Sequence, residues 1–237
     1  MRSAATLGNF PFDLIPGQGM SSRCEVISPC CDRQPTRPSV PRGLMFAALS
    51  YVVRMSRATR ADMFLPSAED PRQGGPSGGD ERATLVEFLR CQRLTLELKC
   101  SGLDAADLAR RSVEPSTMSL LGLVRHMAEV ERQWFRDRMS GLSSVPYFYS
   151  DDDPDGEFDS ALPDQALVEE AWRAWRDEVA FADRLIAEAP SLDVVGKFGD
   201  DGRISLRELL VHMIEEYARH NGHADLLRER IDGRIGE

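Results

Sequence analysis

Apolar residues recur at helical spacing in four long stretches of the chain, which cover about residues 81–100, 118–140, 165–188 and 205–231. An apolar stripe that repeats every three to four residues indicates an amphipathic helix with one buried face. No stretch of useful length alternates between apolar and polar residues, and residues 193–204 have room for a small turn at most. The pattern therefore predicts an all-α fold, and four helices of this length favour a four-helix bundle.

Residues at the predicted helix ends support these boundaries. Asp164 can cap the third helix, and Ser205 with Glu208 has the spacing of a capping box at the start of the fourth. Gly233 follows the end of the fourth helix, where a glycine commonly ends a helix. The acidic and aromatic stretch 147–159 is predicted to be a loop. The connections are longer than a minimal bundle needs, so at least one of them can cross over.

The first 79 residues differ in composition from the rest of the chain. They contain nine prolines, and their nine arginines and six acidic residues give a net charge of +3, whereas residues 80–237 carry −13. Frequent prolines without a sustained apolar stripe argue against a packed core. We therefore predict a disordered extension over 1–79 and a helical domain over 80–237. Met63 is an alternative start, which would remove residues 1–62 from the protein.

Charge and cysteine content narrow the class of protein. The 237 residues carry a net charge of −10, and an acidic surface repels the phosphates of nucleic acids. No run of about 18 apolar residues is present, so we expect no membrane span. The five cysteines do not form a paired pattern, which is typical of reduced thiols in a cytoplasmic protein.

The positions of the histidines indicate a candidate binding site, because all four lie on the second and fourth predicted helices. On a helical wheel, Glu216 and His220 fall on the apolar face of the fourth helix, one turn apart. His126 lies at the edge of the apolar stripe of the second helix. Together these three residues have the composition of a two-histidine, one-carboxylate site for a divalent metal such as Zn²⁺. The alternative is a buried Glu216–His220 pair beside a helix-edge histidine.

Other residues near these three are candidates for supporting roles. His212 and His223 lie on the same flank of the fourth helix and are candidate outer-shell groups or spare ligands. A basic lip above a metal would favour a thiol cosubstrate, because many low-molecular-weight thiols carry carboxylates. The candidates for such a lip, and so for substrate binding, are Arg125, Arg132 and Arg219.

Two segments resemble the DinB/YfiT-like metalloprotein superfamily. The first runs from Ser119 through His126 to Trp134, and the second from His212 to Asp225. The resemblance implies a four-helix bundle in up-down-down-up order, with one crossover. It also implies a metal triad that falls on His126, Glu216 and His220, with glutamate at the middle position as in the mycothiol-dependent maleylpyruvate isomerase branch. Bacillithiol transferases are further relatives.

The resemblance and the residues leave three hypotheses. The first is a metal-dependent S-transferase that acts with a low-molecular-weight thiol such as mycothiol. The second is a metal-dependent hydrolase with the same triad, and the third is a bundle that binds a metal or small ligand without catalysis. We expect a small-molecule substrate or thiol as partner, no nucleic acid and no membrane, and a homodimer is a candidate assembly. The isomerase has a further C-terminal domain that this sequence lacks after Glu237, so we do not expect maleylpyruvate isomerisation.

Overall fold

The computed structural model describes residues 65, 69–75, 78–198 and 202–236. Most of these residues are helical, as the apolar pattern predicts, and the long helices begin and end within about two residues of the predicted positions. The elements are α1 (Glu81–Cys100), α2 (Ala105–Leu108), α3 (Leu120–Glu131), η1 (Arg132–Met139), α4 (Gly156–Asp159), α5 (Gln165–Glu188), β1 (Val195–Phe198), β2 (Gly202–Ser205) and α6 (Leu206–Asp232).

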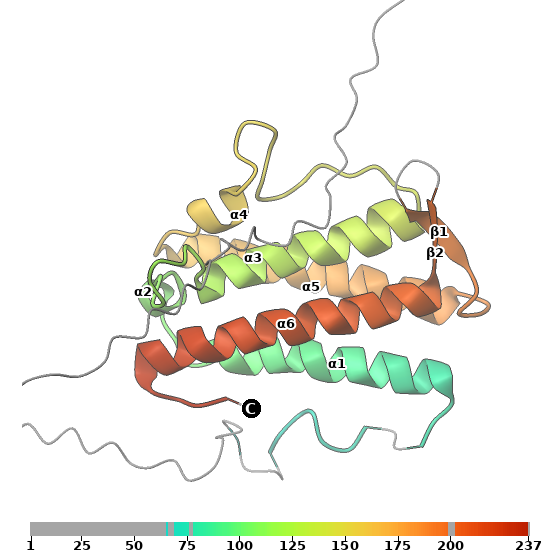
Figure 1. The fold of residues 1–237 in the computed structure, drawn as a ribbon, viewed down its shortest axis with the longest axis horizontal. Coiled ribbons are helices and arrows are strands. Elements are labelled where there is room, and N and C mark those ends of the chain that lie inside the picture. Colours follow the sequence, from blue (N-terminus) through green and yellow to red (C-terminus); the bar gives the residue numbers. More distant parts are fainter. Residues whose placement is uncertain (1–64, 66–68, 76–77, 199–201, 237) are drawn as a thin grey trace, which may run out of the picture. The chain divides into compact units, whose positions relative to one another are not determined.

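The long helices pack in two pairs, α1 with α6 and α3 with α5, and α3 also contacts α6 (Figure 1). Arg207 at the start of α6 pairs with Glu81 at the start of α1, and Arg228 near the end of α6 donates to the carbonyl of Lys99. The helices α1 and α6 therefore run in the same direction. Figure 1 shows that α3 and α5 both begin where α1 and α6 end, so this pair runs in the opposite direction.

Side-chain caps fix the start of each long helix. Asp80 accepts a hydrogen bond from the amide of Ala83, and Asp164 accepts from Ala166. The capping box predicted at Ser205 and Glu208 is confirmed, since both of its reciprocal hydrogen bonds are present. These bonds satisfy amide groups that have no partner within the first helical turn.

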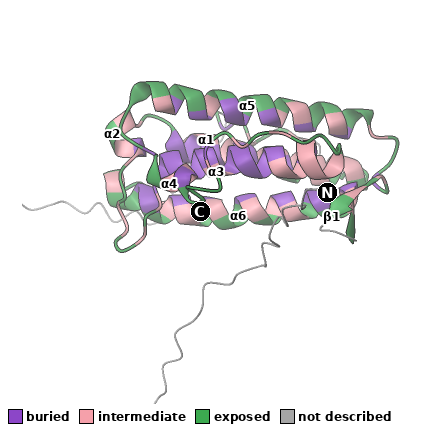
Figure 2. Ribbon diagram, turned by 90° about the horizontal axis from the view of Figure 1, so that it is seen from above, coloured by how far each residue is buried: buried purple, intermediate pink, exposed green. Residues whose placement is uncertain are grey.

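Buried apolar side chains fill the space between the helices. Figure 2 marks the buried residues of the helices in purple. The stripes predicted from the sequence supply most of the buried side chains. The helices α5 and α6 leave a polar face exposed, whereas no residue of α3 is exposed. Among the most buried members are Leu89, Leu96, Leu120, Leu123, Val124, Met127, Leu209, Met213 and Leu227.

A polar network crosses this core and joins all the long helices. The guanidinium of Arg93 on α1 donates two hydrogen bonds of 2.7 Å to the carboxylate of Glu131 on α3. The hydroxyl of Tyr217 on α6 donates to Glu131 at 2.7 Å, and the indole of Trp175 on α5 donates to Tyr217 at 2.8 Å. Arg93 also pairs with Asp183. Each buried charge thus has a partner, which buried charges require.

The helix predicted over residues 118–140 winds in two ways. Its first part is the α-helix α3, and its last eight residues form the π-helix η1. In a π-helix, residues five apart lie one turn apart. This winding places Asp137 beside the buried guanidinium of Arg132, which donates to it at 2.7 Å.

Two short elements depart from the sequence prediction. Residues 193–204 were expected to hold a turn at most, yet β1 and β2 form an antiparallel hairpin in which Val195 lies opposite Ser205. The strands have four residues each and are mostly exposed, so they carry no apolar alternation by which to recognise them. The helix α4 lies within the predicted loop 147–159.

Part of the N-terminal extension packs on α1. Arg90 donates to the carbonyl of Pro71, and Arg72 donates to the hydroxyl of Thr95, while Asp70 is buried. Residues 69–75 therefore make specific contacts with α1, through the backbone carbonyl of Pro71 and the side chain of Arg72. Residues 1–64 lie outside the described residues. No helix in the described part of the chain is long and apolar enough to cross a membrane.

Candidate metal centre

His126, Glu216 and His220 converge at the contact between α3 and α6. Each offers one nitrogen or oxygen atom, and these three atoms all lie within 4.8 Å of one another. The Nε2 atoms of His126 and His220 are 3.1 Å apart, and Nε2 of His220 is 3.5 Å from Oε2 of Glu216. Glu216 and His220 share a face because they are one turn apart on α6, and the packing of α3 against α6 brings His126 to them.

Each of the three side chains also has a polar contact with a residue outside the triad. Nδ1 of His126 lies 2.7 Å from Oε1 of Glu157 on α4. Nδ1 of His220 lies 3.4 Å from Nδ1 of His223, and Oε1 of Glu216 lies 3.8 Å from Nε2 of His212. The flank predicted for His212 and His223 is therefore next to the three converging residues. The ring of Trp134 packs on His212 with 4.3 Å between centroids.

The electrostatics of the cluster favour the neutral form of His212, His220 and His223 and the ionised form of Glu216. Burial lowers the pKa of His220, and the same cause lowers the pKa of His212 and of His223. The pKa of Glu216 is lowered chiefly by its interaction with His220, against the opposing effect of burial. A neutral imidazole and an ionised carboxylate are the forms that bind a metal ion, because both present a free lone pair.

Two of the three separations between the ligand atoms are close to those found around a small divalent cation. Ligands placed tetrahedrally about 2.0–2.1 Å from Zn²⁺ lie about 3.3 Å from one another. The distances of 3.1 Å from His126 to His220 and 3.5 Å from His220 to Glu216 bracket this value. Two imidazoles and one carboxylate also match the donors that Zn²⁺ accepts, and three protein ligands leave one position for a substrate or water.

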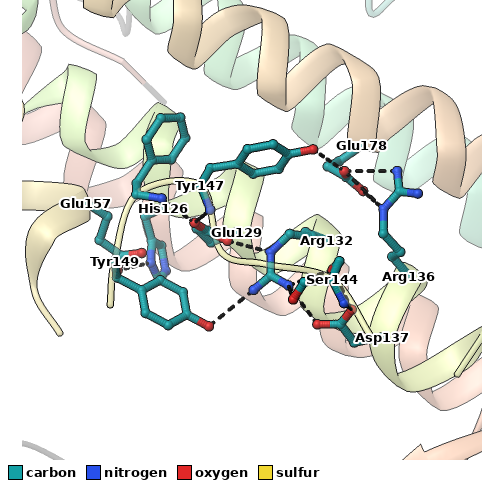
Figure 3. Close-up of polar contacts among 11 residues, drawn as sticks. His126, Glu129, Arg132, Arg136, Asp137, Ser144, Tyr147, Tyr149, Glu157 and Glu178 are labelled. Carbon is teal, nitrogen blue, oxygen red and sulfur yellow. Dashed lines mark hydrogen bonds and ion pairs between the residues drawn. The ribbon is translucent and has the colours of Figure 1, made fainter. Parts of the chain in front are cut away.

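Two of the three arginines expected at a substrate-binding lip are buried and bound by the protein. Arg125 donates to the carbonyls of Gly156 and Ser160, and the side chain is only 5% exposed. Arg132, which is 2% exposed, donates to several groups shown in Figure 3, namely Glu129, Asp137, Ser144 and Tyr149. The expectation for Arg125 and Arg132 is therefore corrected, since their donors hold the connection between η1 and α5 in place.

Arg219 has the environment that the sequence predicted. Its side chain is 60% exposed, and its guanidinium lies 3.5 Å from Oε1 of Glu216. It is the member of the predicted set that stands both beside the converging residues and in contact with solvent.

Glu157 is a residue of this site that the sequence did not single out. It comes from the acidic and aromatic stretch predicted as a loop, where nothing distinguishes its carboxylate from the acids around it. Figure 3 shows Glu157 directed at His126, separate from the chain of polar contacts that runs from Arg132 through Glu129 and Tyr147 to Glu178 on α5. Glu157 and His126 are 31 residues apart in the sequence and meet only because α4 packs against α3 in the folded chain.

The fold and these residues define a helical protein with a candidate metal centre of two histidines and one glutamate. Comparison with known protein families identifies the family of this chain. The model of the Mycothiol-S-transferase family matches residues 84–233, which is more than half of the chain, and the protein belongs to this family. No curated protein and no solved structure matches the chain.

Proposed function

We propose that this protein is a metal-dependent S-transferase that uses mycothiol as its thiol substrate, with His126, Glu216 and His220 as the ligands of Zn²⁺. The observation that carries the proposal is the convergence of the three ligand atoms in a chain of the Mycothiol-S-transferase family. The helix directions support the four-helix bundle in up-down-down-up order, which brings the second and last long helices together at this point.

The protein side chains would prepare the site for a thiol. A bound divalent cation supplies positive charge that stabilises a thiol sulfur as its anion near neutral pH. Glu216 contributes one negative charge, so the three ligands neutralise only half of a dication and leave net positive charge for an anionic sulfur. His126 and His220 are neutral donors that are held from behind by Glu157 and His223. Arg219 is positioned to bind a polar group of the substrate.

The reaction is tested with the full-length chain after loading with zinc. The protein is incubated with mycothiol and a bimane electrophile, and the thioether product is separated by chromatography. We expect product formation above the uncatalysed rate, with loss of that excess in His126→Ala and after treatment with a chelator. Glu215→Ala is the matched control, because Glu215 is exposed and precedes Glu216 on α6.

Two results would overturn this function. One is a rate in the zinc-loaded protein that equals the rate without protein. The other is a rate that His126→Ala leaves unchanged. Replacement of mycothiol by cysteine or glutathione tests the thiol itself, and equal rates with all three thiols would contradict the assignment of mycothiol.

A further inference from the structure

The carboxylate of Glu157 is bound to His126 on the side of the ring away from the other two ligands. Its Oε1 lies 2.7 Å from Nδ1, while Nε2 of the same ring faces His220. Both side chains are mostly buried, with 14% of Glu157 and 22% of His126 exposed. Partial burial strengthens this contact, because water competes with it less than at an open surface.

The backbone around Glu157 is fixed by contacts that do not involve its own side chain. Arg125 donates to the carbonyls of Gly156 and Ser160, at 3.0 and 2.9 Å, and so holds both ends of α4. Phe158 packs against α3 at Gly122, where a Cβ atom would lie 2.7 Å from the phenyl ring. Glycine at position 122 therefore permits the close approach that presents Glu157 to His126.

The pairing determines which nitrogen of His126 carries the proton. An ionised carboxylate only accepts hydrogen bonds, so Nδ1 must be the donor to Glu157. A neutral imidazole has one N–H, which leaves a lone pair on Nε2 directed toward His220 and Glu216. Without Glu157 the ring is free to adopt the other tautomer, which would direct a proton at the place where a cation binds.

We propose that Glu157 is a positioning residue for the metal centre, which holds His126 in the tautomer and ring orientation that a metal ion requires. The inference rests on the proposed function and adds to it a residue outside the triad. Among the described residues, the carboxylate of Glu157 hydrogen-bonds His126 alone. Its removal should therefore spare the docking of α4, which Arg125 and Phe158 provide.

The test is the zinc affinity of the full-length protein, measured by competition with a chromophoric chelator. We expect Glu157→Ala to raise the Kd for zinc about 10–100-fold, as is typical when the partner of a metal-binding histidine is lost. Glu157→Gln should recover most of the affinity, because its amide oxygen accepts the same hydrogen bond. Asp159→Asn is the matched control on α4, since Asp159 is largely exposed and pairs with Arg111. It should leave the Kd unchanged.

A second measurement works without metal. The ¹⁵N NMR shifts of the His126 ring in the chelated protein should show a protonated Nδ1, and Glu157→Ala should abolish that preference. An unchanged zinc Kd and an unchanged tautomer in Glu157→Ala would overturn the positioning role while leaving the triad intact. A wild-type protein that binds no zinc would instead refute the proposed function, whatever the tautomer. Equal losses in the alanine and glutamine variants, with a lowered melting temperature in both, would show that Glu157 has only a structural role.

Discussion

Two polar clusters lie close together where the helices α3 and α6 meet, and they differ in how their polar atoms are used. In the core network, Glu131 of α3 accepts hydrogen bonds from Arg93 and Tyr217, all of 2.7 Å. The second cluster, called the histidine cluster here, consists of His126, Glu216 and His220 with the neighbouring His212 and His223. In it, the carboxylate of Glu216 lies 3.5 Å or more from His212, Arg219 and His220. Glu216 and Tyr217 are neighbours in the sequence, yet they belong to different clusters because successive residues of a helix point in different directions.

The difference separates a structural cluster from a candidate binding site. In the core network the buried groups Arg93 and Glu131 are bound by protein groups at hydrogen-bonding distance. In the histidine cluster the three lone-pair donors of His126, Glu216 and His220 instead converge, with their atoms within 4.8 Å of one another. Removal of a buried carboxylate that has close partners destabilises the fold, whereas a carboxylate that lies beside two imidazoles has unused capacity for a cation.

The largest effect on stability is expected from breaking the core network at Glu131. Glu131→Ala leaves the buried guanidinium of Arg93 without its main partner, and breaking such a pair costs about 3–5 kcal/mol. Urea unfolding of the chelated protein measures this loss. Glu170→Ala, a change at an exposed acid of α5, should stay within about 0.5 kcal/mol of the wild type. A loss below about 1 kcal/mol in Glu131→Ala would contradict the structural role.

A smaller effect is expected from Tyr217→Phe. The change removes one hydrogen bond to Glu131 and leaves the indole N–H of Trp175 without its acceptor, at a cost of about 1–3 kcal/mol. The same urea titration detects it. Zinc affinity should stay within a factor of about three, because Tyr217 is not a ligand. A large loss of affinity with little loss of stability would show that the two clusters are coupled.

The smallest effect on the stability of the folded protein is expected from a change of pH, measured on the chelated protein. Burial lowers the pKa of His212, His220 and His223, so the unfolded chain takes up protons at a higher pH than the folded chain does. The stabilisation is fully present above the ordinary histidine pKa of about 6.5 and is lost as the pH falls through the lower folded values. His212→Gln should therefore flatten the loss of stability between pH 7 and 5. An equal slope in wild type and variant would contradict the burial of this imidazole.

The positions of the long helices and most residues of the candidate site could be predicted from the sequence. The apolar stripes and the cap residues Asp164 and Ser205 are local signals, and they place the helix ends well. Glu216 and His220 share a face through their spacing alone, and His126 needed only the packing of one helix on another. These features depend on α-helical geometry, which is the same in every α-helix.

The features that the sequence did not reveal depend on the path of the folded chain. Glu157 reaches His126 because Arg125 binds the ends of α4, and no local pattern encodes such a contact. Arg125 and Arg132 looked like solvent-facing groups, since arginine is rarely buried without partners. The partners of Arg125, and Ser144 and Tyr149 among those of Arg132, come from the connection between η1 and α5, in which the sequence predicted only a loop.

The central claim, that His126, Glu216 and His220 bind a divalent metal, is tested most directly by zinc stoichiometry. Full-length wild type, Glu216→Ala, Glu216→His and the control Glu215→Ala are loaded with zinc, desalted and analysed for metal per chain. We expect one zinc ion per chain in wild type and in Glu215→Ala. We also expect one in Glu216→His, because imidazole can take the position of the carboxylate, and a strong loss of zinc in Glu216→Ala. One zinc ion per chain in Glu216→Ala, or none in wild type, would contradict the claim.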